Sequence, residues 1–176
     1  MTRWACGIFV MLAAISANGA EDPSSALQGL MWLAGDWRGI GEGEPGTSAS
    51  ERHVEPFLGR FLRMDGSSAY PRQERNPRGE IHRQMDVWSY DEARATLVLR
   101  EFDDLGFVAT YVLDAAASTA DRLVLIGEHL ENVPQGWRAR YTFTFVPPDE
   151  FREMLELDAD GRGFKPYVSN RYLRIN

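Results

Sequence analysis

Histidine offers the widest range of chemistry in this 176-residue chain, because a neutral imidazole can ligate a metal or haem and can accept a proton. The three histidines, His53, His82 and His129, are far apart and form neither a His-x-His nor a His-Glu-x-x-His pattern. Their spacing therefore predicts no metal site. His129 follows Glu128 in a strand-like run. If it faces the protein interior it would serve as a haem ligand or proton acceptor, and otherwise it is a structural histidine.

Serine and carboxylate positions do not form the patterns of known catalytic or calcium sites. Ser67, Ser68 and Ser89 lie outside any Gly-x-Ser-x-Gly sequence, which marks a nucleophile at a strand-to-helix turn. Asp158 and Asp160 resemble the start of a calcium loop but lack its downstream carboxylate, so we interpret them as turn residues. The sequence therefore favours binding over catalysis.

Two charged residues interrupt strand faces that are otherwise apolar. Glu153 lies between Phe151 and Leu155, and Arg171 lies between Tyr167 and Leu173 at alternating positions. A buried charge is costly unless it is paired, so each of them needs a partner. Glu153 and Arg171 either pair with each other, or Arg171 holds the carboxylate of a ligand.

Aromatic residues at alternating positions are the remaining candidates for a binding site. They would line or fill an interior space. The predicted ligand contacts are Glu153, Arg171 and four aromatic residues: Trp37, Tyr111, Tyr141 and Tyr167. Alternation places the aromatic side chains of residues 137–145 on one face of a strand and Arg138 and Arg140 on the other. Burial of apolar surface should turn the aromatic face inward, at about 25 cal/mol per Å².

The elements that must position these residues are almost all strands. Short alternating runs bounded by Gly, Pro, Asn and Asp predict strands near 36–43, 49–57, 60–69, 80–89, 95–102, 106–114, 122–130, 137–146, 150–157 and 166–175. Residues 26–33 predict a short helical turn that plugs one end. We therefore expect an all-β fold, a single closed antiparallel barrel of about ten strands, over residues 21–176.

The opening stretch Leu30-x-x-Leu33-Ala34-Gly35-Asp36-Trp37-Arg38-Gly39-x-Gly41-x-Gly43 resembles the first strand of calycin-like barrels, the group of lipocalins, fatty-acid-binding proteins and nitrobindin-like haem proteins. The stretches at 79–82, 88–91 and 170–174 are similar to those of exported bacterial members. The resemblance implies a barrel around one ligand. Nitrobindin-like members hold haem through a histidine in a late strand, whereas this chain has no histidine after His129.

The N-terminus predicts export. Arg3 precedes an apolar run over 8–15, and small residues follow up to Ala20, which is the order of a signal peptide cleaved near Ala20. Cys6 is the only cysteine and lies within this segment, so the exported domain would have no disulfide. We expect a periplasmic or secreted protein with no later membrane span.

Charge and composition exclude some partners. The formal net charge is −7 and no basic patch is evident, which argues against nucleic acid. Three hypotheses remain. The first is a lipocalin-like barrel that binds a small hydrophobic or amphipathic ligand, without catalysis and without a cofactor. The second is a haem barrel that uses His129, and the third is a solidly packed barrel that acts as an interaction or envelope-stress protein.

Overall fold

A computed structural model describes residues 23–175 of the chain. The predicted signal peptide, residues 1–20, lies outside the described residues. No helix within the described range is both long and apolar enough to cross a membrane.

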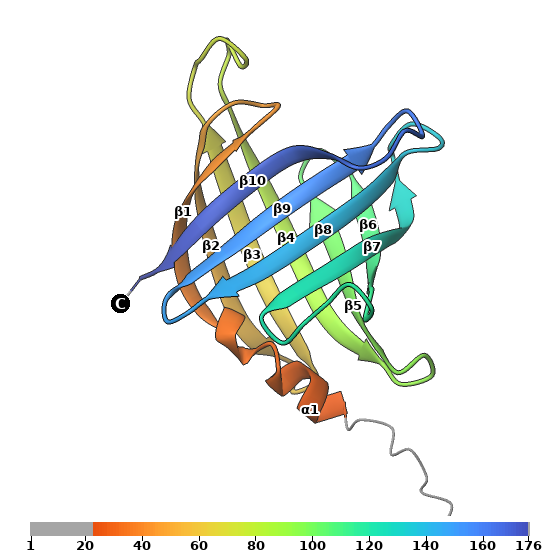
Figure 1. The fold of residues 1–176 in the computed structure, drawn as a ribbon. Coiled ribbons are helices and arrows are strands. Elements are labelled where there is room, and N and C mark those ends of the chain that lie inside the picture. The colour runs from red at the N-terminus through yellow and green to blue at the C-terminus, as the bar shows by residue number, and fades with distance from the viewer. Residues whose placement is uncertain (1–22, 176) are drawn as a thin grey trace, which may run out of the picture.

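Ten antiparallel strands form one closed barrel (Figure 1). Each strand pairs with its neighbours in sequence, and β1 closes the barrel against β10. The strands are β1 (Gly35–Gly43), β2 (Ser48–Phe57), β3 (Phe61–Tyr70), β4 (Glu80–Asp91), β5 (Thr96–Asp103), β6 (Val108–Leu113), β7 (Arg122–Glu131), β8 (Arg138–Val146), β9 (Glu150–Asp158) and β10 (Lys165–Arg174). The predicted strands agree with these bounds to within two residues, which confirms the all-β barrel.

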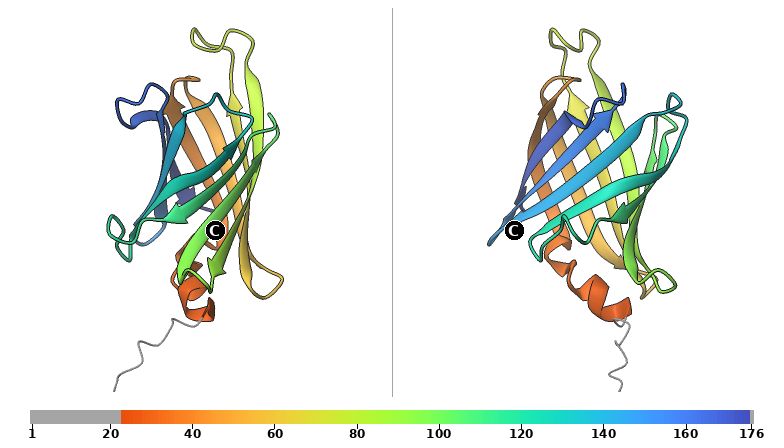
Figure 2. Two further views of the ribbon diagram at one scale, coloured as in Figure 1. Left: turned by 90° about the vertical axis from the view of Figure 1, so that its right-hand side faces the viewer. Right: turned by 45° about the vertical axis from the view of Figure 1, so that its right-hand side comes forward.

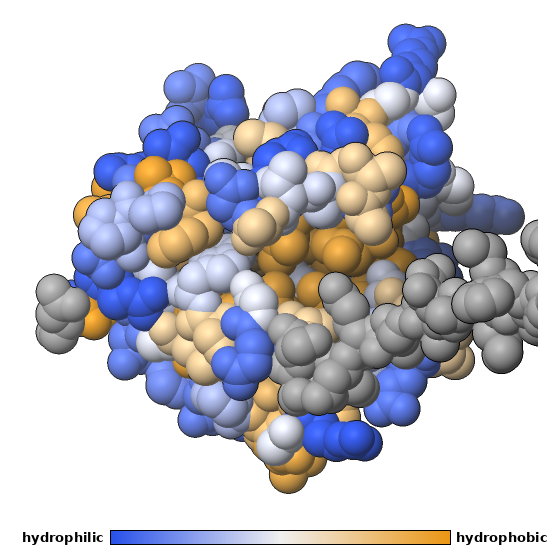
Figure 3. Space-filling model, turned by 60° about the horizontal axis from the view of Figure 1, so that its bottom comes forward, coloured by the Kyte–Doolittle hydropathy of each residue, from blue (hydrophilic) through white to orange (hydrophobic). Residues whose placement is uncertain are grey.

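The N-terminal helices lie across one end of the barrel (Figures 1 and 2). They are α1 (Pro23–Gln28) and the 3-10 helix η1 (Met31–Leu33). Leu30 and Leu33 are buried against the barrel core, so the predicted helical plug is confirmed. Figure 3 views this closed end and shows hydrophobic residues gathered near its middle.

The half of the barrel next to α1 is packed solid. Its core comes from the strand ends on that side, and the largest fully buried apolar side chains are Trp37, Leu62, Met64, Trp88, Leu99, Leu125, Phe143, Phe151 and Tyr172. Aromatic rings make much of this contact, because Trp37 meets Phe151 edge-on at 4.7 Å and Phe151 stacks on Tyr172 at 4.7 Å between centroids. The space left for a ligand is therefore in the opposite half.

Glycines on the inner face of β1 make room for the side chains of β10. A Cβ on Gly39 would lie 2.6 Å from the ring of Tyr172, and a Cβ on Gly41 would lie 2.5 Å from Ser48 Oγ and closer still to Asn170 Oδ1. Both distances are well below ordinary van der Waals contact. The alternating glycines of the opening motif thus allow Tyr172 and Asn170 to turn inward from the neighbouring strand.

Candidate functional site

The interior of the barrel encloses a cavity of about 310 Å³ in the half opposite α1. Its walls are largely apolar and come from β6 to β10 and the loops at that end, including Phe107, Ala109, Leu130, Val133, Trp137, Ala139, Leu155, Leu157 and Val168. Its polar lining comes from the facing strands and includes Arg52, Gln84 and Glu101. The lumen is therefore not packed solid, and the cavity has an apolar side and a polar floor.

A buried ion pair forms the deepest part of that floor. Arg52 on β2 donates through Nε and Nη2 to the two carboxylate oxygens of Glu153 on β9, at 3.2 and 3.0 Å, and both side chains are almost fully buried. The hydroxyls of Tyr141 and Tyr172 and the amide of Asn170 also donate to Glu153 Oε2, at 3.4, 3.2 and 3.4 Å. Such a bidentate, fully hydrogen-bonded arrangement satisfies the desolvated Glu153 charge.

Two further carboxyl groups lie beside this pair without a cation of their own. Asp86 and Glu101 are register partners on β4 and β5, and both face inward. Gln84 links them to the ion pair, because it accepts from Arg52 at 3.4 Å and donates to Asp86 Oδ2 at 2.9 Å. Burial and then the proximity of Glu101 raise the pKa of Asp86 well above its usual value. Burial also raises the pKa of Glu101 to about 7, against the opposing effect of a Tyr111 hydrogen bond.

The raised pKa of Glu101 predicts that the protein loses stability as the pH rises from 5 to 8. The native state retains a proton that the unfolded chain releases near pH 4.5, so stability is greatest below that pH and decreases up to about pH 7. A pKa shift of this size corresponds to about 3 kcal/mol. Urea unfolding at pH 5, 6, 7 and 8 measures this loss, and Glu101→Gln should remove much of it while stabilising the protein at pH 8.

His53 provides the control for that measurement. Its pKa is raised, first by its hydrogen bond to Asp36, so it too contributes stability that is lost as the pH rises through that value. The pair is exposed, and exposed pairs contribute about 0–1 kcal/mol. His53→Gln should therefore leave most of the pH dependence in place. A flat profile for the unaltered protein would show that Glu101 and Asp86 are not buried as described.

The structure brings together three of the residues predicted to contact a ligand and separates the others. Tyr111, Tyr141 and Tyr167 line the cavity. Glu153 lies behind its lining, within hydrogen-bond reach of Tyr141. Trp37 is fully buried at the closed end, where its Nε1 donates to Leu33 O at 2.7 Å. The prediction that Trp37 contacts a ligand is therefore wrong, and Trp37 is a core residue.

The prediction that Arg171 faces the lumen is also wrong. Its side chain is 59% exposed, and its Nη2 donates to Glu150 Oε2 at 2.6 Å on the outer wall. The inner face of β10 carries Asn170 and Tyr172 instead, where the Asn170 Nδ2 and the Tyr172 hydroxyl donate to Glu153 Oε2. Tyr167 reaches the cavity because the register of β10 shifts between Pro166 and Val168, which lets two consecutive residues line it.

His129 is likewise on the outer wall, contrary to the hypothesis that it faces the lumen. Its side chain is 69% exposed and lies 3.5 Å from Glu131. Among the described residues His82 is the one histidine that lines the cavity, and it lies 3.2 Å from Glu80 and 5.4 Å from the ring of Tyr70. The late-strand histidine of nitrobindin-like proteins has no counterpart, so the described interior does not fit that mode of haem binding.

Sequence reasoning missed Arg52, Asp86 and Glu101. The inner face of β2 reads Ser48, Ser50, Arg52 and Val54, and its outer face is equally polar, so hydrophobic alternation does not distinguish the two. The sequence contained one indication of the Arg52 site, the glycine at position 66 within β3. A Cβ at Gly66 would lie 2.6 Å from Arg52 Nη1. A glycine inside a strand indicates close approach of another group.

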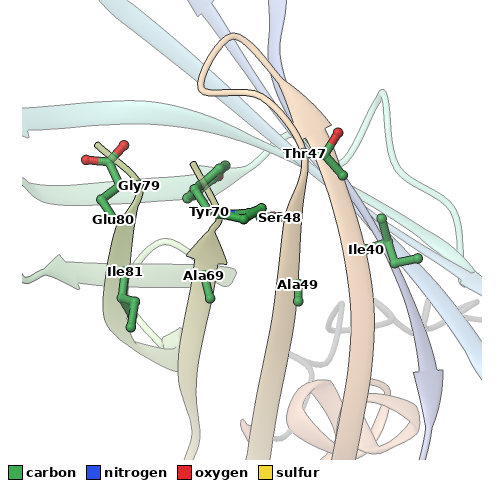
Figure 4. A pocket seen from close by; sticks show the side chains of 10 residues that line it. Ile40, Thr47, Ser48, Ala49, Ala69, Tyr70, Gly79, Glu80 and Ile81 are labelled. Carbon is green, nitrogen blue, oxygen red and sulfur yellow. The ribbon is translucent and has the colours of Figure 1, made fainter. Parts of the chain in front are cut away.

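A second hollow lies on the outer wall of the barrel (Figure 4). Ile40, Ala49, Ala69 and Ile81 are register partners across β1 to β4 and form an apolar row on its surface. The lining of this hollow includes no buried charged side chain, whereas the cavity has Arg52, and converging polar groups give a site its specificity. We therefore place the candidate site in the lumen. No three His, Cys, Asp or Glu side chains within residues 23–175 form a group that could hold a metal ion.

The fold and this site define a closed ten-stranded antiparallel barrel with an enclosed cavity. No model of a protein family matches the chain, and no curated protein matches it. Among solved structures the chain is similar to Rv2717c from M. tuberculosis, with 18% identity over 86% of this chain and 98% of that chain, and a TM-score of 0.60. It also matches a redesigned β-barrel (12% identity, 82% and 93% covered, TM-score 0.44) and a de novo designed fluorescence-activating β-barrel (8%, 82% and 95%, 0.39). The similarity to Rv2717c concerns the fold.

Proposed function

We propose that this protein binds one small amphipathic ligand in the lumen of its barrel and that it acts without catalysis and without a cofactor. The cavity of about 310 Å³ carries this proposal, because it combines apolar walls with a few buried polar groups. Cavities of this size and lining are typical of small-molecule sites. The third hypothesis, a solidly packed barrel, has no such space.

The proposal extends to the kind of barrel and to its location. The opening motif with Trp37 and its alternating glycines supports membership of the calycin-like group, in the exported branch related to lipocalins and nitrobindin-like proteins. The basic, apolar and small residues of the first 20 positions support export to the periplasm or the medium, with cleavage near Ala20.

Binding of a neutral fluorescent probe tests the proposed function. N-phenyl-1-naphthylamine should gain fluorescence in the lumen and saturate at one molecule per barrel. Ala109 lines the cavity, so Ala109→Phe should fill part of it and weaken binding by about tenfold, which is 1.4 kcal/mol. Titration of the probe into the wild-type protein and the variant measures this difference.

Ala49→Phe is the matched control, because Ala49 is exposed on the outer wall. It should leave probe affinity unchanged, and urea unfolding of both variants separates blockage from loss of fold. Equal affinity in both variants would place the probe outside the lumen and contradict the proposal. A sharp Soret band with stoichiometric haem, lost in His82→Ala, would instead favour a haem barrel in which His82, and not His129 as first expected, is the ligand.

A further inference from the structure

We propose that the lumen selects ligands that carry a cationic amine, with the ammonium group held by Glu101 above Asp86 and the apolar body against Leu130, Leu155 and Leu157. This inference rests on the proposed function, since it names the chemical class of ligand for the same cavity. It depends on three observations, which concern charge, hydrogen bonding and the use of Arg52.

The first observation is an imbalance of charge in the floor of the cavity. Three carboxyl groups, those of Asp86, Glu101 and Glu153, face inward around the guanidinium of Arg52. A fourth carboxyl group, that of Asp103, and the imidazole of His82 also line the cavity. The Glu153 carboxylate accepts hydrogen bonds from both Nε and Nη2 of Arg52 and is its ion-pair partner. Asp86 and Glu101 therefore remain without a cation. A buried carboxyl group in this position must hold a proton or meet a cation from elsewhere.

The second observation is an acceptor without a donor. Asp86 is fully buried, and its Oδ1 has no hydrogen-bond partner among the described residues. Asn170 lines the cavity, is 4% exposed, and its Oδ1 also lacks a partner. A buried acceptor that makes no hydrogen bond is destabilising, so each of these oxygens favours a ligand that donates to it. Two nitrogens on the same strand, β4, also lack a hydrogen-bond partner: Trp88 Nε1 in the packed core, and Nε2 of His82, which lines the cavity.

The third observation is that Arg52 has no donor left for a ligand. Besides Glu153, it donates to Glu51 O at 3.0 Å, to Ser67 O at 3.5 Å and to Gln84 Oε1 at 3.4 Å. A ligand carboxylate would therefore find no free guanidinium here and would meet the carboxyl groups of Glu101 and Asp103, which both line the cavity. An ammonium group offers both the charge and the N–H donors that this floor lacks.

The groups that surround Glu101 decide how binding depends on pH. Those that interact with it are Asp86 on β4, Tyr111 on β6, Arg52 on β2, Glu153 on β9, Tyr141 on β8 and Asp103 on its own strand. Because the pKa of Glu101 is about 7, a proton competes with the ammonium below that pH. Amine affinity should therefore rise about tenfold from pH 6 to pH 8, while the alkylammonium itself stays protonated.

Three probes with one alkyl chain and different head groups test the inference: octylamine, octanol and octanoate. Each is titrated against bound N-phenyl-1-naphthylamine at pH 6 and pH 8. At pH 8 octylamine should displace the probe at a concentration at least about tenfold lower than octanol or octanoate, an advantage of about 1.4 kcal/mol. Calorimetry of octylamine binding at pH 6, in buffers of different ionisation enthalpy, should show the release of close to one proton.

Glu101→Gln should reduce octylamine to the affinity of octanol and leave octanol unchanged. Glu42→Gln, the same change on an exposed residue of β1, should alter neither. If octanol or octanoate binds as tightly as octylamine, this inference is overturned. The same holds if the Glu101→Gln variant still prefers octylamine. In both cases the proposed binding of a ligand in the lumen stands. If neither the probe nor any of the three ligands binds, the proposed function itself fails.

Discussion

Arg52→Met should destabilise the protein by about 3–5 kcal/mol, because it leaves Glu153 buried without its cation. Both side chains are almost fully buried, and the pair joins β2 to β9 across the lumen. Two tyrosine hydroxyls and the Asn170 amide would still donate to Glu153, but no charge would balance it. Urea unfolding at pH 7 measures the loss.

The double variant Arg52→Met with Glu153→Gln separates the ion pair from simple packing. Replacing both charges removes the stranded carboxylate, so the double variant should recover much of the stability that the single variant loses. The pair of Arg171 and Glu150 on the outer wall is the matched control, since the Arg171 side chain is 59% exposed and Arg171→Met should cost far less. An additive cycle, with no recovery, would mean that Arg52 and Glu153 do not interact inside the barrel.

The strands were predictable because their signals are local. Alternation bounded by turn residues locates all ten strands, and the inward face of β8 with Tyr141 and Phe143 follows from hydrophobicity alone. Closure into a barrel required the additional argument that antiparallel strands with one apolar face and mostly hairpin-like connections close most easily into a barrel. The helical turn before Trp37 could be predicted for the same local reasons.

The polar part of the site was not predictable from hydrophobicity, because its inward residues are polar. Leu173 on β10 and Ile175 just after it are exposed to solvent, while Asn170 and Tyr172 face inward to Glu153. This is why Arg171 was assigned to the wrong face. The partner of Glu153, Arg52, is 101 residues away in sequence and two strands beyond β10 around the closed barrel. Only the register of the closed barrel brings the two together.

Trp37→Ala should cost about 3–5 kcal/mol in free energy of unfolding, which is the range for removal of a large buried ring. The Trp37 ring is fully buried, meets Phe151 edge-on, and lies 4.0 Å beneath the guanidinium of Arg174. Its Nε1 donor also holds Leu33 of the 3-10 helix against the barrel. The loss therefore combines a cavity, a cation–π contact and a hydrogen bond, and urea unfolding at pH 7 measures it.

Trp137→Ala is the matched control, because Trp137 lines the mouth of the cavity and is only half-buried. Trp137→Ala should lower the free energy of unfolding by about 1 kcal/mol and should alter binding of the neutral probe. Trp37→Phe should be more stable than Trp37→Ala, because a phenyl ring fills part of the space. If Trp37→Ala and Trp137→Ala lower the free energy of unfolding equally, the division of the barrel into a packed half and an open half is wrong. That division explains the opening motif, since Trp37 fills the closed end while the glycines after it admit the side chains that build the polar floor.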